Sequence, residues 1–572
     1  MTHTRFVPVE VLSSPNDLAG AGWDQVRPFY QELLERPVDA AWLREWSRLE
    51  DLIAEAASLA RAHYYADTQD QALRAAELRF SSEIKPAAAD MAARLSRRLL
   101  DSGYSEPDFE NVLSQMRNQA GILVAENVAL LGEEAKLCER WDGTFGSLTA
   151  NWEGREVPRL SLVSQITSPD RDIRKRAWLA VSEPVTARYG ELDSLFASLV
   201  DLRARIARNA GCESYSEYGR RMRNRIDFTL SETDRIYESL LEAWLPLLTT
   251  WRARETSRLG VGHLRPWDSR APTSPTALKP FESTDELTGT FERVFSAVHP
   301  RLGDHFAGMR RDGLLDLGFR PHAAPIAINS RLHFTRRAHI FMSLPPGDLA
   351  VTMLAHEAGH SFHFLESADY PLHWQGLYNS MAAEFASITM QLLVIDRMSR
   401  PFGGFYSDVD ARHSAAMRLR EAVQLPVRQA LGHAFERWAY DHPTADEADR
   451  AAAWRRIWGR QVEGENWAGI QEHIDAFRCG LKMMYTWPFY DFDYMVGSLG
   501  ALQVWRNYLQ DPKGAIEAYL DALRLGNTKT VPEIYATAGA RIDLDPKSMG
   551  ELAGFVAERL EQFETPLRSV GD

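Results

Sequence analysis

The sequence predicts a mostly α-helical protein with a few short strands near the middle of the chain. Apolar residues recur at three- and four-residue steps over residues 40–100, a pattern typical of amphipathic helices packed face to face. The same pattern returns over residues 170–218 and 231–259, and again from Gly347 almost to the end of the chain. With 572 residues, 45% of them hydrophobic, the chain has ample apolar surface to bury in a core.

Three stretches interrupt the helical pattern. Residues 141–162 combine glycines with alternating apolar residues, which predicts a hairpin. Residues 260–281 are rich in proline and predict a linker. Residues 316–346 read as irregular or extended, with a short strand over 339–344.

Composition excludes several classes of protein. There are 65 basic and 79 acidic residues, a net charge of −14, without a basic block, so nucleic acid is not an expected partner. The three cysteines (Cys138, Cys212 and Cys479) are far apart and indicate a reducing environment. Residues 1–15 lack the apolar run of a signal peptide, and no apolar run is long enough for a membrane span. We therefore expect a cytoplasmic protein without a membrane partner.

One motif carries recognisable chemistry. Residues 356–360 read His-Glu-Ala-Gly-His, and only about 0.03 chance matches to HExxH are expected in this composition. We expect Asp348 to cap the helix that contains the motif. His356 and His360 then lie one turn apart on one face, where both imidazoles reach one metal ion. Glu357 lies beside that face and is the candidate base for a metal-bound water. The glycine of the motif leaves room for close packing of a neighbouring backbone.

A catalytic zinc needs a third protein ligand and an open position. His363 is too far along the helix, because a straight helix rises about 10 Å between positions 356 and 363. His363 is instead expected either to contact and orient a metal ligand without binding the metal itself, or to be exposed to solvent. The better candidate is Glu384, 24 residues after His360 in a second helical run. Zinc is the default metal for a His₂Glu set, with cobalt or manganese as alternatives.

These residues resemble a known family. The 356–360 motif and the segment Met381-Ala382-Ala383-Glu384-Phe385 are similar to the oligoendopeptidase F and thimet oligopeptidase family of HExxH zinc metallopeptidases. Further similar stretches are residues 62–86, 211–223, 264–268, 434–443, 487–494 and 499–505. The resemblance implies one large helical unit with two lobes around a deep channel. We expect residues 1–200 to form its N-terminal helical region and residues 201–572 its catalytic region.

The resemblance also implies a function, an intracellular zinc endopeptidase that hydrolyses internal amide bonds of short unstructured peptides. One zinc per chain would be held by His356, His360 and Glu384. Glu357 would serve as general base and then as general acid. At least one of Tyr490 and Tyr494 is expected to stabilise the oxyanion; ordinary aromatic packing is the alternative for both. The strand at 339–344 is expected either to bind peptide as an edge strand or to be purely structural.

The sequence also departs from the family pattern. Residues 482–486 lack the family's histidine, Asn379 stands where a histidine is common, and residues 320–326 replace a glycine-rich substrate loop. Asp491 and Asp493 add negative charge beside the tyrosines. His322, His333 and His339 are alternative sources of the missing donor.

These departures predict narrowed substrate choice. They are also consistent with an alternative function, a biosynthetic hydrolase or lyase that acts on one dedicated peptide or amide-like substrate. A non-catalytic peptide- or zinc-binding protein is the alternative from another class, and the intact Glu357 argues against it, because binding alone does not require that carboxylate. The oligomeric state is not predicted.

Overall fold

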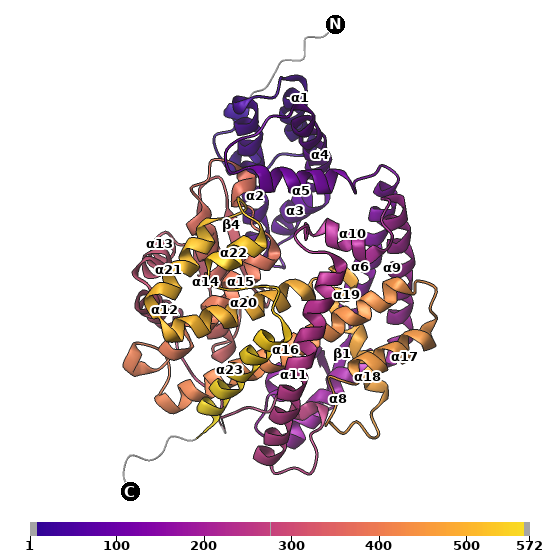
Figure 1. Cartoon of the computed structure of the whole chain (residues 1–572), viewed down its shortest axis with the longest axis vertical. Coiled ribbons are helices and arrows are strands. Elements are labelled where there is room, and N and C mark those ends of the chain that lie inside the picture. Colours follow the sequence, from indigo (N-terminus) through magenta and orange to yellow (C-terminus); the bar gives the residue numbers. More distant parts are fainter. Residues whose placement is uncertain (1–8, 275, 566–572) are drawn as a thin grey trace. The chain divides into compact units, whose positions relative to one another are not determined.

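The predicted mostly helical fold is confirmed by the computed structural model, which describes residues 9–274 and 276–565 (Figure 1). The chain forms two compact units, each assembled from three stretches. Unit 1 takes in residues up to 120, 278–411 and 497–541, and unit 2 takes in 121–277, 412–496 and those from 542 onward. One crossing between the units falls inside the expected linker at 260–281. The compact units do not test the predicted division into an N-terminal helical region (1–200) and a catalytic region (201–572). That division stays a prediction.

The first helices of unit 1 surround an aromatic core. Helix α2 (Ala40–Ala66) begins at Asp39, whose carboxylate accepts a hydrogen bond from the backbone N–H of Trp42 at 2.8 Å. Trp42 and Trp46 are fully buried on its inner face. The other elements of this part are η1 (Val9–Val11), η2 (Pro15–Leu18), α1 (Trp23–Glu35), α3 (Gln71–Arg79), η3 (Phe80–Ile84), α4 (Lys85–Ser102) and α5 (Glu110–Ala120).

A three-stranded sheet lies in the middle of unit 1. Its strands are β3 (Leu315–Leu317), β4 (Ala327–Leu332) and β5 (Arg337–Met342), in the order β3-β5-β4. The predicted extended stretch is confirmed, with its last strand two residues earlier than expected. Strand β5 pairs parallel with β3 and antiparallel with β4, so of the two alternatives for this strand the peptide-binding edge strand was wrong. The turn that contains Arg336, at φ 54°, folds β5 back onto β4, and β4 lies at one edge of the sheet.

Two helices after the sheet carry the histidine motif and Glu384, namely α14 (Asp348–Ser367) and α15 (Ser380–Leu393). The expected cap at Asp348 was wrong, because the N-cap is Gly347. Asp348 lies in the first turn, where its carboxylate accepts a hydrogen bond from the Tyr406 hydroxyl at 2.7 Å. Asn379 is the N-cap of α15 and accepts a hydrogen bond from the backbone N–H of Met381.

The remaining elements of unit 1 pack around this pair. They are α12 (Thr284–Val298), α13 (Pro300–Arg311), η6 (His373–Gly376), η7 (Ile395–Arg397), η8 (Arg400–Phe402), α21 (Pro512–Arg524) and α22 (Val531–Thr537). Two helices, α16 (Asp408–Asp441) and α20 (Asp491–Gln510), begin in one unit and end in the other.

Unit 2 contains the predicted hairpin, formed by β1 (Thr149–Trp152) and β2 (Arg155–Pro158). Its turn residues Glu153 and Gly154 both have positive φ. The first residues assigned to the hairpin instead complete α6 (Asn127–Gly146). The other elements are η4 (Arg159–Leu162), α7 (Val163–Ile166), α8 (Arg171–Ala187), α9 (Tyr189–Asn209), α10 (Tyr215–Met222), α11 (Leu230–Leu259), η5 (Pro266–Asp268), α17 (Glu447–Trp458), α18 (Glu472–Cys479), α19 (Lys482–Thr486) and α23 (Pro546–Glu564).

Among the helices that the structure describes, none has the length and apolarity needed to cross a membrane.

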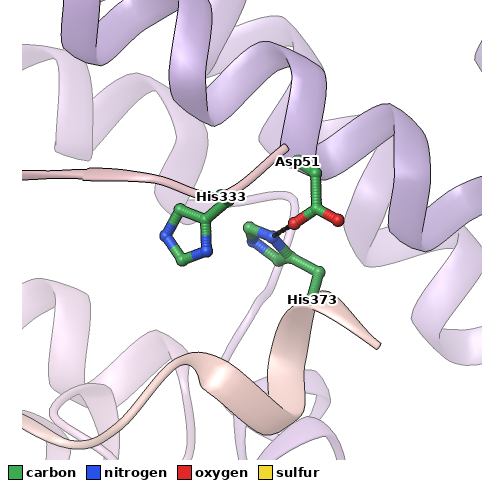
Figure 2. A group of neighbouring side chains, drawn as sticks. All are labelled: Asp51, His333 and His373. Carbon is green, nitrogen blue, oxygen red and sulfur yellow. Dashed lines mark hydrogen bonds and ion pairs between the residues drawn. The ribbon is translucent and has the colours of Figure 1, made fainter. Parts of the chain in front are cut away.

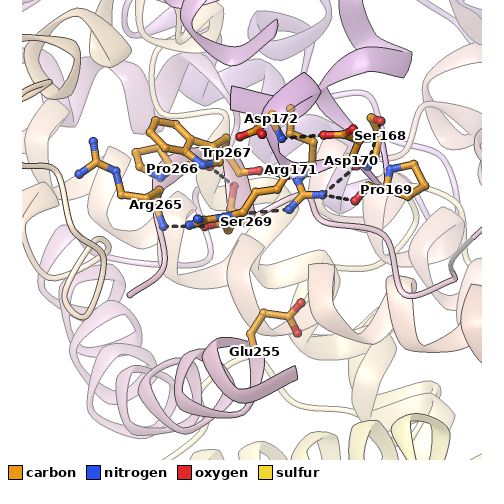
Figure 3. Close-up of polar contacts among 12 residues, drawn as sticks. Ser168, Pro169, Asp170, Arg171, Asp172, Glu255, Arg265, Pro266, Trp267 and Ser269 are labelled. Atoms are coloured by element: carbon orange, nitrogen blue, oxygen red, sulfur yellow. Dashed lines mark hydrogen bonds and ion pairs between the residues drawn. The ribbon is translucent and has the colours of Figure 1, made fainter. Parts of the chain in front are cut away.

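A buried carboxylate fixes the start of α8 to the turn at 265–269 (Figure 3). Asp268 is 1% exposed and accepts two hydrogen bonds from the Arg171 guanidinium, at 2.9 and 2.6 Å. The buried Arg174 adds a third at 3.2 Å, and the backbone N–H of Arg265 a fourth at 2.9 Å. Burial by itself raises the pKa of Asp268, but these donors outweigh it and hold the pKa below its usual range.

Asp268→Asn is expected to lower the free energy of unfolding by about 3–5 kcal/mol at neutral pH, because it leaves a buried guanidinium without its charge partner. Since the folded-state pKa is depressed, the stabilisation is fully present above the unfolded value and is lost as the pH falls through the folded value. The difference from the native protein should therefore shrink as the pH falls below 3.8, the ordinary pKa of an aspartate. Chemical denaturation at neutral pH and at several lower pH values measures it.

Asp142→Asn is the matched control, because Asp142 pairs with Lys482 at the surface of the same unit. Its removal should change the free energy of unfolding by less than about 1 kcal/mol. Equal effects of the two substitutions would contradict the assignment of a buried anchor.

Candidate metal centre

The structure brings the three predicted ligands together in unit 1. His356 and His360 extend from α14 with ring centroids 4.8 Å apart, and Glu384 extends from α15. The Nε2 of His356 lies 3.6 Å from the Oε2 of Glu384. One donor atom from each of the three residues lies within 4.8 Å of the other two.

A close helix contact produces this convergence. The glycine of the motif, Gly359, faces α15, and a Cβ there would lie 2.6 Å from the Cα of Ser387. The α14 and α15 backbones therefore touch, as the sequence predicted for Gly359 (Figure 1). Ser387 is nearly one turn beyond Glu384, so the contact holds Glu384 beside the two histidines.

Hydrogen bonds orient the two imidazoles. The Nδ1 of His356 lies 3.2 Å from the Oε1 of Gln391, whose amide Nε2 donates to the Thr352 carbonyl at 3.3 Å. The amide oxygen can only accept, so His356 carries its proton on Nδ1 and keeps the lone pair of Nε2 for a metal. The ring of His360 is hydrogen-bonded to the backbone of Ala383.

Sequence reasoning missed Gln391. It lies seven residues after Glu384, two turns along α15, and so occupies the same face of the helix. This seven-residue spacing is the feature of the sequence from which the position of Gln391 near the metal ligands could have been predicted.

The donor set fits a divalent metal such as zinc. Burial lowers the pKa of His356 to about 4 and that of His360 well below its ordinary value, so both rings are neutral at neutral pH, the form that binds a metal. Two ligands of a tetrahedral zinc with bonds of about 2.0–2.1 Å lie roughly 3.4 Å apart. The distance between His356 and Glu384 is close to that value.

Glu357 is almost fully withdrawn from solvent, with 5% of its surface exposed. Burial raises the pKa of its carboxyl to about 7, although a hydrogen bond from the backbone N–H of Asn329 lowers it. Asn329 belongs to the edge strand β4, and its side-chain amide donates to the Ser361 hydroxyl at 2.7 Å. No spacing or motif in the sequence predicts the role of Asn329, because its position depends on how the sheet packs against α14.

His363 is fully buried, so the solvated alternative for this residue is wrong. Its ring stacks on Tyr378 with centroids 3.5 Å apart, and the Tyr378 hydroxyl donates to the His360 carbonyl at 3.2 Å. Burial lowers the pKa of His363 to about 3. The residue lies outside the ligand group, as helix geometry predicted, and packs against the side chain that contacts the His360 backbone.

The two candidate tyrosines lie in unit 2. Tyr490 precedes α20 and Tyr494 is in its first turn, with ring centroids 5.3 Å apart. The Arg223 guanidinium lies 4.9 Å from the centre of the Tyr490 ring. Asp493 is buried and paired with Arg225 at 2.7 Å, and burial raises the pKa of Asp491 to about 6. The negative charge expected beside the tyrosines is therefore partly compensated.

The structure explains two of the differences from the family pattern, those at residues 482–486 and at Asn379. Residues 482–486 form α19, whose Met484 and Tyr485 are fully buried. Asn379 acts as a helix cap. Of the histidines considered as substitute donors, His322 is exposed and His339 lies in β5, while His333 lies near Asp51 and His373. A role for any of them in substrate binding stays a prediction.

Comparison with known proteins finds similarity to peptidases. Residues 341–550 match the model of peptidase family M3, which takes in α14, α15 and α20. An oligoendopeptidase F homologue from Borreliella burgdorferi is 20% identical over 443 residues, covering 72% of this chain and 70% of the relative.

Solved structures share the fold along nearly the whole chain. PZ peptidase A, solved with an inhibitor, has a TM-score of 0.86 at 21% identity and covers 95% of this chain and 98% of its own. Oligoendopeptidase F from Enterococcus faecium has a TM-score of 0.60 at 15% identity, with coverage of 97% and 98%. The resemblance drawn from the sequence is thus confirmed: the chain is similar to the metallopeptidases of peptidase family M3 in sequence over residues 341–550, and to solved oligopeptidases in fold along nearly its whole length.

Proposed function

We propose that this protein is a zinc-dependent endopeptidase that hydrolyses internal amide bonds of short unstructured peptides. One observation supports the proposal above all. Two neutral imidazoles and a carboxylate converge from adjacent helices, and a further buried carboxyl, Glu357, lies between the two histidines in sequence. Metal binding alone does not require that fourth group.

His356, His360 and Glu384 would hold the zinc. When bound, zinc supplies a Lewis acid that polarises the scissile carbonyl and acidifies water in the site. Gln391 and the Ala383 backbone keep the two imidazoles in the orientation that zinc binding needs.

Glu357 would move the proton. Its carboxylate accepts a proton from the attacking water and delivers it to the leaving amine, acting as base and then as acid. The Asn329 N–H holds one side of this carboxyl group. Burial excludes competing solvent and brings its pKa closer to neutrality, which suits both steps.

The peptide and the oxyanion need further groups. We assign the oxyanion donor to the hydroxyl of Tyr490 or Tyr494. The edge of β4 that does not pair with β5 is a suitable place for the peptide main chain, since Asn329 on that strand contacts Glu357 and an edge strand can pair with an extended peptide.

Glu357→Gln tests the assigned base. The amide cannot take up the proton, so turnover of a mixture of short unstructured peptides should fall by about 10²–10⁴-fold, while zinc binding stays intact. Mass spectrometry of the products and metal analysis of the protein measure both. Glu447→Gln, at an exposed position, is the control and should retain full activity. Unchanged turnover in Glu357→Gln would refute the role.

Gln391→Met tests the orientation of His356. Methionine has a similar length but lacks the amide oxygen, so zinc affinity should fall by about 10–100-fold. A competitive chelator titration measures the affinity, with the exposed Gln510→Met as the matched control. Equal affinity in the two variants would show that the hydrogen bond has no part in zinc binding.

A further inference from the structure

A second group of metal-binding side chains lies elsewhere in unit 1. Asp51 comes from α2, His333 from the turn between β4 and β5, and His373 from η6. Figure 2 shows the three side chains meeting from these separate segments. One donor atom of each lies within 4.8 Å of the other two, the same criterion that the His356, His360 and Glu384 group meets.

The group can offer three donor atoms to one ion. The Nδ1 of His373 lies 2.6 Å from the Oδ1 of Asp51, so in the neutral ring the Nδ1 proton lies between these two atoms. A metal ion that binds both residues displaces this proton to solvent, because a metal ligand must be deprotonated. The His333 ring lies 4.8 Å from the His373 ring. Within the described part of the chain, the His333 ring makes no hydrogen bond.

His333 is also held in the form that binds a metal. Burial lowers its pKa well below the ordinary value, with contributions from His373 and Arg331. A neutral imidazole facing an aspartate–histidine pair is a ready nitrogen ligand.

The segments that carry the group are anchored independently of any metal. The backbone N–H of His373 donates to the Ser47 hydroxyl of α2 at 2.8 Å, and Trp374 packs on Trp46 with ring centroids 4.3 Å apart. On the other side, the edge of the His333 ring contacts Phe364, with centroids 5.1 Å apart.

We propose that Asp51, His333 and His373 form a second site for a divalent transition metal, separate from the catalytic group. Two imidazole nitrogens and one carboxylate oxygen suit zinc and neighbouring first-row ions. The ion ties α2 to the β4–β5 turn and to the connection between α14 and α15. A hydrogen-bonded aspartate–histidine pair accounts for Asp51 and His373, and packing on Phe364 accounts for one side of the His333 ring, whereas a shared ion accounts for the meeting of all three side chains.

The test counts zinc ions in the full chain after chelation and reloading with zinc alone. The native protein should bind two ions, and His333→Ala and Asp51→Asn one each. The double variant His356→Ala/His360→Ala should also retain one ion. His322→Ala, at an exposed position outside both groups, is the matched control and should bind two.

Metal analysis and calorimetric titration give the stoichiometry, and circular dichroism checks folding. Where a variant of the second site fails to fold, the His356→Ala/His360→Ala protein decides the question by itself. One bound ion that raises its melting temperature supports the second site, and none overturns it. Two ions bound by folded His333→Ala would overturn the proposal as well, whatever the peptidase activity.

Discussion

The contact between α14 and α15 at Gly359 is the constraint on which the metal centre depends. A side chain at this position would meet the Ser387 Cα at 2.6 Å, so only glycine allows the two helices to come this close. On the other side of α15, a Cβ at Gly497 would meet the Glu384 backbone at 2.9 Å. Helix α15 is thus held between two glycine contacts, and Glu384 has little freedom to move away from the histidines.

The same packing sets the protonation of the site. Close helices and the adjacent sheet exclude water, and a dry environment disfavours charged groups. The two histidine ligands are therefore neutral and ready for a metal, while the pKa of Glu357 rises to about 7. Metal binding and proton transfer thus trace back to one physical cause, the burial of ionisable groups between tightly packed elements.

The sequence predicted what depends on local spacing. The two histidines share a helix face because they are four residues apart. The glycine at position 359 predicted the close packing of a neighbouring backbone, which is that of α15. Glu384 was identified by its distance along the chain and by a family resemblance.

Features that depend on contacts between segments far apart in the sequence were not predicted. Strand β5 is central because β3 and β4 pair on both sides of it, and Asn329 reaches Glu357 through that sheet. The group of Asp51, His333 and His373 unites three distant segments, and no spacing signals such a meeting.

The zinc affinity of Gly359→Ala tests the central claim most directly. The added methyl group must push α15 away from α14, so zinc affinity should fall roughly tenfold or more, in line with an overpacking cost of about 1–3 kcal/mol. Gly132→Ala in α6, where a Cβ would have no neighbour within 4 Å, should bind zinc like the native protein. If Gly359→Ala folds and binds zinc as tightly as that control, the close helix contact does not build the site.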